Sequence, residues 1–91
     1  MNSGRYGFTN HAWLQLNELP DDRAQLVRDT AQALPAWVDQ KQVAPHGYDE
    51  FEKPFYKAKI KWDGLSLELE FHLQISRMSP KRAIIRKIVV R

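Results

Sequence analysis

The sequence predicts a single α+β domain, in which an N-terminal αα-hairpin packs on a three- to four-stranded antiparallel β-meander. Apolar residues recur at helical spacing as far as residue 40, and they alternate with polar residues from residue 55 onward. An Asp-Gly pair interrupts this alternation, and such a pair is the strongest short-range signal for a hairpin. We therefore divide the 91-residue chain into a helical hairpin at 9–40, a loop at 41–54 and a meander at 55–91.

The N-terminal part is expected to form two helices after a short strand at residues 5–8. Thr9 or Asn10 can cap the first helix, and Pro20 ends it and suits the first turn of the second. Pro35 lacks an amide hydrogen and restricts the residue before it, so the second helix should stop or kink there. Its buried stripe is predicted from apolar residues at helical spacing: Ala24, Val27, Ala31 and Leu34.

Residues 41–54 show no clean period and contain two prolines and one glycine. We expect a loop, which is longer than most connections within a compact domain. Its aromatic residues, Tyr48 and Phe51, are expected to dock on the core.

The stretch from residue 55 to residue 75 predicts a hairpin with a fixed register. A two-residue turn at Asp63-Gly64 places Trp62 opposite Leu65 and, further along, Tyr56 opposite Phe71. One side of the hairpin is then wholly apolar. The other side, which we call the open face, carries Lys57, Lys59, Lys61, Glu68, Glu70 and His72. Lysines and glutamates lie opposite one another there, and each such pair contributes about 0.2–1 kcal/mol.

The closing run RAIIRKIVVR is dense in β-branched residues and predicts a third antiparallel strand. Its alternation is imperfect, so two orientations are open. In one, Ile84 and Ile88 join the core and Ile85 lies on the open face. In the other, Arg86 faces outward together with Ile84 and Ile88. Either orientation leaves apolar side chains on the open face, where the N-terminal segment or a partner would cover them.

Charge is distributed unevenly along the chain. Residues 1–52 hold four basic and eight acidic side chains, whereas residues 53–91 hold ten basic and three acidic ones. The basic half favours contact with a polyanion or an acidic protein surface. The candidate binding residues are Lys61, Arg77, Lys81, Arg82, Arg86, Lys87 and Arg91.

The composition also limits the class of protein. The chain has no cysteine, which excludes disulfides and thiolate metal sites and suits a reducing cytoplasm. No apolar run approaches the ~20 residues that span a bilayer, so we expect a cytoplasmic protein without membrane contact. The three histidines have no ligand spacing, and we expect neither a metal nor a cofactor.

Much of the chain resembles the RelE/ParE toxin superfamily. The matching residues are Phe8, Thr9, Leu16, Leu19, Pro20, the run 24–34, Tyr56-Lys57-Ala58-Lys59 and the closing AIIRKIVVR. The chain departs from the family pattern at LSLELEF, where a G-x-Y/W-R element is usual, and at Arg91, where the ribonucleolytic members carry an aromatic or histidine tail. The resemblance implies a toxin of a toxin-antitoxin module, with an acidic antitoxin as partner and the ribosome or mRNA as target.

The open face also suggests chemistry. Glu70 and His72 stand two apart on one strand, so their side chains point the same way, about 7 Å apart. With Lys57 and Lys59 beside them, they form a candidate metal-independent endoribonuclease site, with a base, an acid and cations for the phosphate. The alternative is that Glu70 only pairs with Lys57 and His72 only packs near Phe55.

Two other function classes fit the same residues. One is a non-enzymatic inhibitor or adaptor, of the kind carried by phages and mobile elements, which binds a host protein through the basic strand or the 41–54 loop. The other is a small basic nucleic-acid-binding domain, whose affinity would fall steeply with salt. Both a monomer and a homodimer remain open.

Overall fold

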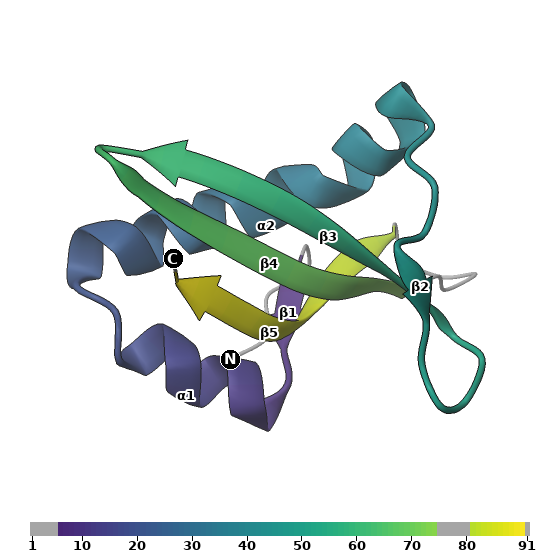
Figure 1. Ribbon diagram of the computed structural model, residues 1–91, viewed down its shortest axis with the longest axis horizontal. Helices are drawn as coiled ribbons and strands as arrows, with labels where there is room; N and C mark the ends of the chain where they lie inside the picture. Colours follow the sequence, from purple (N-terminus) through teal and green to yellow (C-terminus); the bar gives the residue numbers. More distant parts are fainter. Residues whose placement is uncertain (1–5, 75–80, 91) are drawn as a thin grey trace.

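The computed structural model describes residues 6–74 and 81–90 and confirms the α+β class (Figure 1). It contains two helices and five strands. They are, in chain order, β1 (Tyr6–Phe8), α1 (Asn10–Asn17), α2 (Asp21–Lys41), β2 (Gly47–Tyr48), β3 (Pro54–Trp62), β4 (Leu65–Gln74) and β5 (Arg82–Val90).

The strands form one mixed sheet in the order β1-β5-β4-β3-β2. β3, β4 and β5 are consecutive antiparallel neighbours, as predicted, but the sheet is not the purely antiparallel sheet of three to four strands that was expected. β1 joins the sheet as an edge strand parallel to β5, with Tyr6 opposite Ala83 and Phe8 opposite Ile85. β2 adds a fifth strand at the other edge. β1 lies within the short strand expected at residues 5–8, but strands of two or three residues give almost no periodic signal, so the sequence did not reveal the pairing of β1 or the presence of β2.

The central hairpin of β3 and β4 has the predicted register. Trp62 pairs with Leu65, Lys57 with Glu70 and Tyr56 with Phe71. Asp63 and Gly64 have φ angles of 47° and 79°, as a two-residue turn with positive φ at both central positions requires. The turn chemistry and the alternation therefore specified the same alignment.

The helices occupy residues 10–41, close to the predicted 9–40, but the second is not interrupted at Pro35. The Thr9 hydroxyl accepts the Ala12 amide hydrogen and caps α1. α2 continues through Pro35 to Lys41 and ends at Gln42, whose left-handed backbone turns the chain so that the Val43 amide also donates to the Val38 carbonyl, at 3.1 Å. Of the two expected outcomes at Pro35, a stop or a kink, the stop is wrong, because the helix continues for six more residues. Leu34 and Val38 are buried on either side of the proline, and this packing outweighs the lost helical hydrogen bond.

A single hydrophobic core joins both helices to one face of the sheet. α2 crosses behind β3 and β4 in Figure 1, and α1 lies beside β5. The predicted stripe of α2 is buried, as are most of the helix-facing residues of β4 and β5. These core residues are Ala24, Val27, Ala31, Leu34, Leu67, Leu69, Phe71, Ala83, Ile85 and Ile88. Neither helix combines the length and the apolar character that a membrane crossing requires.

A β-bulge decides which side chains of β5 reach the open face. Glu70 lies opposite Lys87 and Phe71 lies opposite Ile85, so Arg86 is the extra residue. Ile85 and Ile88 can then both be buried although they are three residues apart. Neither predicted orientation of β5 is therefore correct along its whole length. Arg86 projects onto the open face, and Ile88 still faces the core.

Thr9 and Gln15 hydrogen-bond to the outer edge of β5 beyond the end of β1. The Thr9 amide donates to the Ile85 carbonyl at 2.9 Å, and the Thr9 hydroxyl reaches the Arg86 carbonyl at 3.4 Å. The Gln15 amide group then accepts from the Ile88 amide at 2.7 Å and donates to the Ile88 carbonyl at 2.8 Å. A glutamine side chain thus replaces a neighbouring strand, which satisfies an edge that would otherwise be free to pair.

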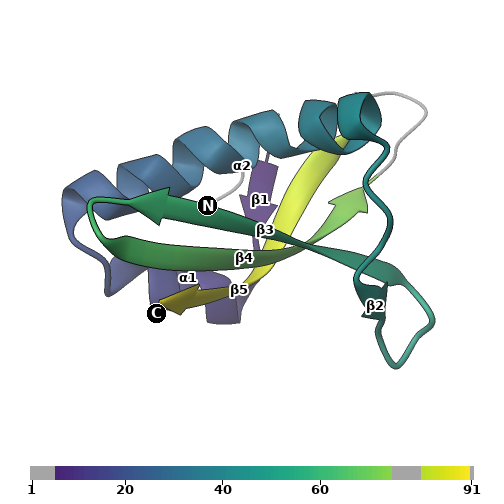
Figure 2. The same cartoon turned by 45° about the horizontal axis from the view of Figure 1, so that its top comes forward.

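Residues 41–54 are less irregular than predicted. Gly47 and Tyr48 pair with Phe55 and Pro54, which ties the segment to β3. A Cβ atom on Gly47 would lie 3.0 Å from the Phe55 ring, so only glycine allows this approach without displacing the ring. Figure 2 shows that the connection from β2 to β3 projects from the side of the sheet away from α2. It therefore borders the open face.

Candidate functional site

Four polar side chains meet on the open face, and we call them the open-face cluster: Asp49, Glu70, His72 and Arg86. Arg86 is central to the cluster. Its Nε atom lies 2.8 Å from a Glu70 carboxylate oxygen, and its Nη1 atom lies 3.1 Å from His72 Nε2. Both contacts fall within hydrogen-bond distance, and the first is charge-assisted.

The contacts of His72 define its tautomer when the ring is neutral. Nδ1 lies 2.8 Å from the Pro54 carbonyl oxygen, which can only accept a hydrogen bond. Nδ1 must therefore carry the hydrogen, and Nε2 is left to accept from Arg86. The ring is held in one orientation, with Nε2 toward the guanidinium.

Phe55 supports the cluster from β3. The Arg86 guanidinium carbon lies 5.0 Å from the centre of the Phe55 ring, which is a cation–π distance. The His72 ring meets the same phenyl group edge-on at 6.5 Å, and the His46 ring approaches it at 5.8 Å. The Phe55 ring thus contacts the Arg86 guanidinium and the imidazole rings of His46 and His72.

Asp49 organises the turn between β2 and β3. One of its carboxylate oxygens accepts the amide hydrogens of Phe51 and Lys53, each at 2.8 Å. Its other oxygen lies 3.6 Å from His72 Nε2. The hydrogen bond from the Lys53 amide lowers the pKa of Asp49 most, and the Phe51 amide and the charges of His72 and Arg86 lower it further, against a smaller effect of burial.

This lowered pKa predicts how the turn responds to acid. A carboxyl group with a lower pKa in the folded state than the usual ~3.9 stabilises the fold above that value. The contribution disappears as the pH falls through the lowered pKa of the folded state. An NMR titration of the Asp49 carboxyl should therefore give a lower midpoint in the protein than in a synthetic peptide of residues 45–55. Equal midpoints would show that the Asp49 hydrogen bonds do not persist in solution.

Two hollows flank the cluster. One, of about 410 Å³, is lined by Thr9, Tyr48, Asp49, Glu50, Phe51, Phe55, His72 and Arg86. The other, of about 390 Å³, shares Asp49, Phe51 and His72 with the first and is also lined by Lys53, Pro54, Leu73, Gln74 and Ile84. Tyr48 and Phe51 stand at the rim of the first hollow, 66% and 74% exposed. The expectation that they dock on the core is wrong.

The structure brings only some of the predicted catalytic residues together. Glu70 and His72 share the open face, and Arg86 joins them. Lys57 lies opposite Glu70 in the ladder, but its ammonium group is 3.5 Å from Glu68, which is 6% exposed. The expected pair of Lys57 and Glu70 is therefore replaced by a diagonal pair, because Arg86 occupies Glu70. Lys59 is exposed and has no ion-pair partner in the described part of the chain.

The candidate binding residues are dispersed rather than gathered. Lys61 is exposed beside the hairpin turn, and Lys87 is exposed on β5. Lys81 forms an ion pair with Asp39 on α2 at 3.0 Å, and Arg82 contacts Gln74 on β4. Arg77 and Arg91 lie outside the described residues. Among the described members of this set, Arg86 alone belongs to the open-face cluster.

Sequence reasoning missed Asp49 and the central position of Arg86. A local pattern could have identified Asp49. This aspartate precedes the amide donors of Phe51 and Lys53, an arrangement that is typical of an Asx turn. The central position of Arg86 could not be located in this way, because it depends on a bulge in the pairing of β5 with β4.

Comparison with protein-family models, with curated proteins and with solved structures finds no match. Within residues 6–74 and 81–90, no group of three or more histidine and carboxylate side chains is placed to hold a metal ion.

Proposed function

We propose that this protein is a RelE/ParE-like toxin that cleaves single-stranded RNA on the open face of its sheet. The observation that carries the proposal is the contact of Arg86 with both Glu70 and His72, beside a hollow with exposed aromatic residues at its rim. A carboxylate, an imidazole and a guanidinium in one cluster supply a base, an acid and a phosphate ligand.

Exposed aromatic residues favour RNA as the substrate over a small molecule. Unstacked bases bind to proteins by stacking on aromatic side chains, at about 1–3 kcal/mol per base. Tyr48 and Phe51 offer such surfaces within the hollow that also contains Arg86. A base stacked there would bring the adjoining phosphate toward the guanidinium.

The proposed reaction is a transesterification that needs no metal. The 2′-hydroxyl attacks the adjacent phosphorus, Glu70 takes the hydroxyl proton, and the bond from phosphorus to the 5′-oxygen breaks. Protonated His72 gives its Nε2 proton to the leaving oxygen, which yields a 2′,3′-cyclic phosphate and a 5′-hydroxyl end. Arg86 stabilises the charge that builds up on the phosphoryl oxygens.

The substrate also explains how His72 becomes available. In the free protein Nε2 of the neutral ring accepts a hydrogen bond from Arg86, so its lone pair is already engaged. A bound phosphate attracts the guanidinium away from Nε2, which leaves this nitrogen beside Asp49 and able to hold the proton that the leaving oxygen receives. Substrate binding and activation of the acid are thereby coupled. The reaction would take place in the cytoplasm, where mRNA and the ribosome are found.

Expression of the chain in a bacterial host tests this proposal. We expect growth arrest together with mRNA fragments that end in a cyclic phosphate. Glu70→Gln and His72→Ala should each reduce cleavage by about 10²- to 10⁴-fold. His11→Ala is the matched control, because His11 is exposed at the start of α1. Cleavage that survives both open-face substitutions, or the absence of any cleavage by the unaltered chain, contradicts the ribonuclease.

A further inference from the structure

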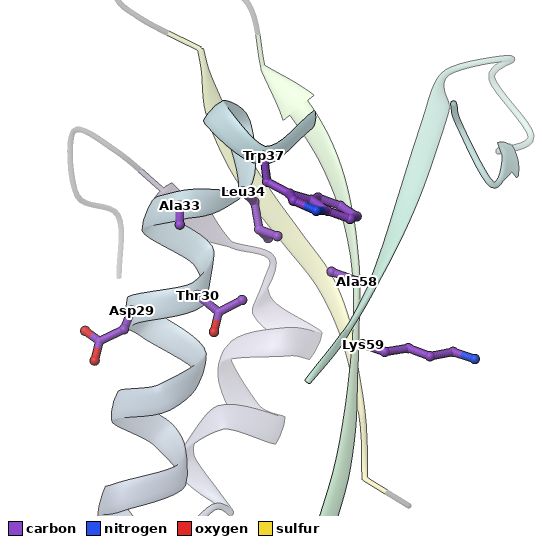
Figure 3. A pocket seen from close by; sticks show the side chains of 7 residues that line it. All are labelled: Asp29, Thr30, Ala33, Leu34, Trp37, Ala58 and Lys59. Carbon is purple, nitrogen blue, oxygen red and sulfur yellow. The ribbon is translucent and has the colours of Figure 1, made fainter. Parts of the chain in front are cut away.

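A groove separates α2 from the outer edge of β3 (Figure 3). Its volume is about 440 Å³, and it is lined by Asp29, Thr30, Ala33, Leu34, Trp37, Ala58 and Lys59. Thr30, Leu34 and Trp37 project from the helix toward the strand, and Ala58 projects toward the helix. Lys59 extends away from the helix and Asp29 points away from the strand, so the interior is apolar.

The strand beside this groove has an unpaired edge. β2 is the outer neighbour of β3, and its pairing ends at Phe55. No other strand in the described part of the chain lies along the remainder of β3 on that side. The two-residue turn makes Trp62 and Leu65 a hydrogen-bonded pair, and such pairs recur at every second residue. The backbone groups of Lys57, Lys59 and Lys61 therefore point outward.

The two sides of this edge differ in character. The open-face side carries the three lysines, and Lys59 and Lys61 are exposed with no ion-pair partner among the described residues. The helix side carries Tyr56, Ala58 and Ile60, with the apolar groove next to them. A strand laid along β3 would alternate in the same way, because neighbouring residues of a strand point to opposite faces.

We propose that the outer edge of β3 binds an extended segment of a partner protein, in which acidic residues alternate with apolar ones. The acidic side chains pair with Lys59 and Lys61 on the open face, and an apolar side chain enters the groove beside Trp37. Outward backbone groups of Lys57, Lys59 and Lys61 supply the hydrogen bonds of strand addition. Lys57, already paired with Glu68, contributes its backbone alone.

The same charges exclude a second copy of this chain as the occupant. Two β3 edges paired with each other would bring their lysine rows together, and like charges at adjacent strand positions are destabilising. Lysines on an edge strand commonly prevent such self-association. A partner strand that carries acidic side chains avoids this repulsion, because its carboxylates attract the lysines.

This inference does not depend on the proposed cleavage of RNA, because the groove shares no residue with the open-face cluster. Cleavage and peptide binding can be measured separately, so failure of one leaves the other standing.

A fluorescein-labelled peptide of about ten residues, the length of a long strand, provides the test. It alternates glutamate with leucine, and the matched control peptide has lysine in place of glutamate. We expect saturable binding of the acidic peptide by fluorescence anisotropy and no binding of the basic one. In the unaltered protein, the bound peptide should slow amide hydrogen exchange at Lys57, Lys59 and Lys61.

Two substitutions of Lys59 distinguish the contribution of its backbone N–H to peptide binding from the contribution of its side-chain charge. Lys59→Pro removes an outward N–H that β4 does not use, and should weaken binding at least about tenfold. Lys59→Glu should weaken binding as much, whereas Lys41→Glu, exposed at the end of α2, should leave it within about twofold. Absence of acidic-peptide binding, unchanged exchange at the three amides, or a dimer that Lys59→Pro dissociates would each overturn the proposal.

Discussion

We expect Arg86→Gln to lower the rate of the proposed RNA cleavage by about 10²- to 10³-fold, the usual cost of removing one group that stabilises charge in the transition state. The guanidinium has five N–H donors, and its contacts with Glu70 and His72 leave further donors for a phosphate. Glutamine keeps similar length and polarity but has no charge. It therefore cannot offset the negative charge that develops on the phosphoryl oxygens.

Arg28→Gln is the matched control, since Arg28 lies on α2 and not in the open-face cluster. Cleavage of a labelled RNA should be measured for both variants under single-turnover conditions, which separate chemistry from binding. A role in transition-state stabilisation requires the chemical step itself to slow. Arg86→Gln that changes only the RNA affinity, or that cleaves as fast as Arg28→Gln, contradicts the proposed role.

Phe71→Ala destabilises the fold by about 3–5 kcal/mol, the cost of truncating a buried phenylalanine. Phe71 is 0% exposed and stacks on Tyr56 with ring centres 5.5 Å apart. It also lies next to the bulge that places Arg86 on the open face. A domain of this size usually has about 5–15 kcal/mol of stability, so the loss would unfold a large fraction of the molecules on mild heating.

Phe51→Ala provides a control with the same chemical change on the surface. Because the Phe51 ring is mostly exposed, we expect the free energy of unfolding to change by less than about 0.5 kcal/mol. RNA affinity should nevertheless fall, by about 1–3 kcal/mol for one lost stacking contact. Urea unfolding measures the first quantity and RNA titration the second. Similar stabilities for Phe71→Ala and Phe51→Ala would contradict the described core.

The sequence by itself determined the class of fold, the alignment of β3 with β4 and the buried stripe of α2. Each of these depends on neighbours within the chain. Asp63 and Gly64 tolerate the positive φ angles of the turn, and alternation then assigns every side chain of the hairpin to one face. Helical spacing likewise places Ala24, Val27, Ala31 and Leu34 on one side without reference to the rest of the molecule.

Only the tertiary structure decided the composition of the open-face cluster and the path of α2. Arg86 reaches Glu70 because a bulge shifts the pairing of β5, and the imperfect alternation within β5 does not show where that shift falls. Asp49 reaches His72 because β2 ties its turn to β3. α2 passes Pro35 because the core holds Leu34 and Val38 on either side of it. In each case contacts between residues distant in the sequence outweigh the local preference, and a local pattern cannot contain that information.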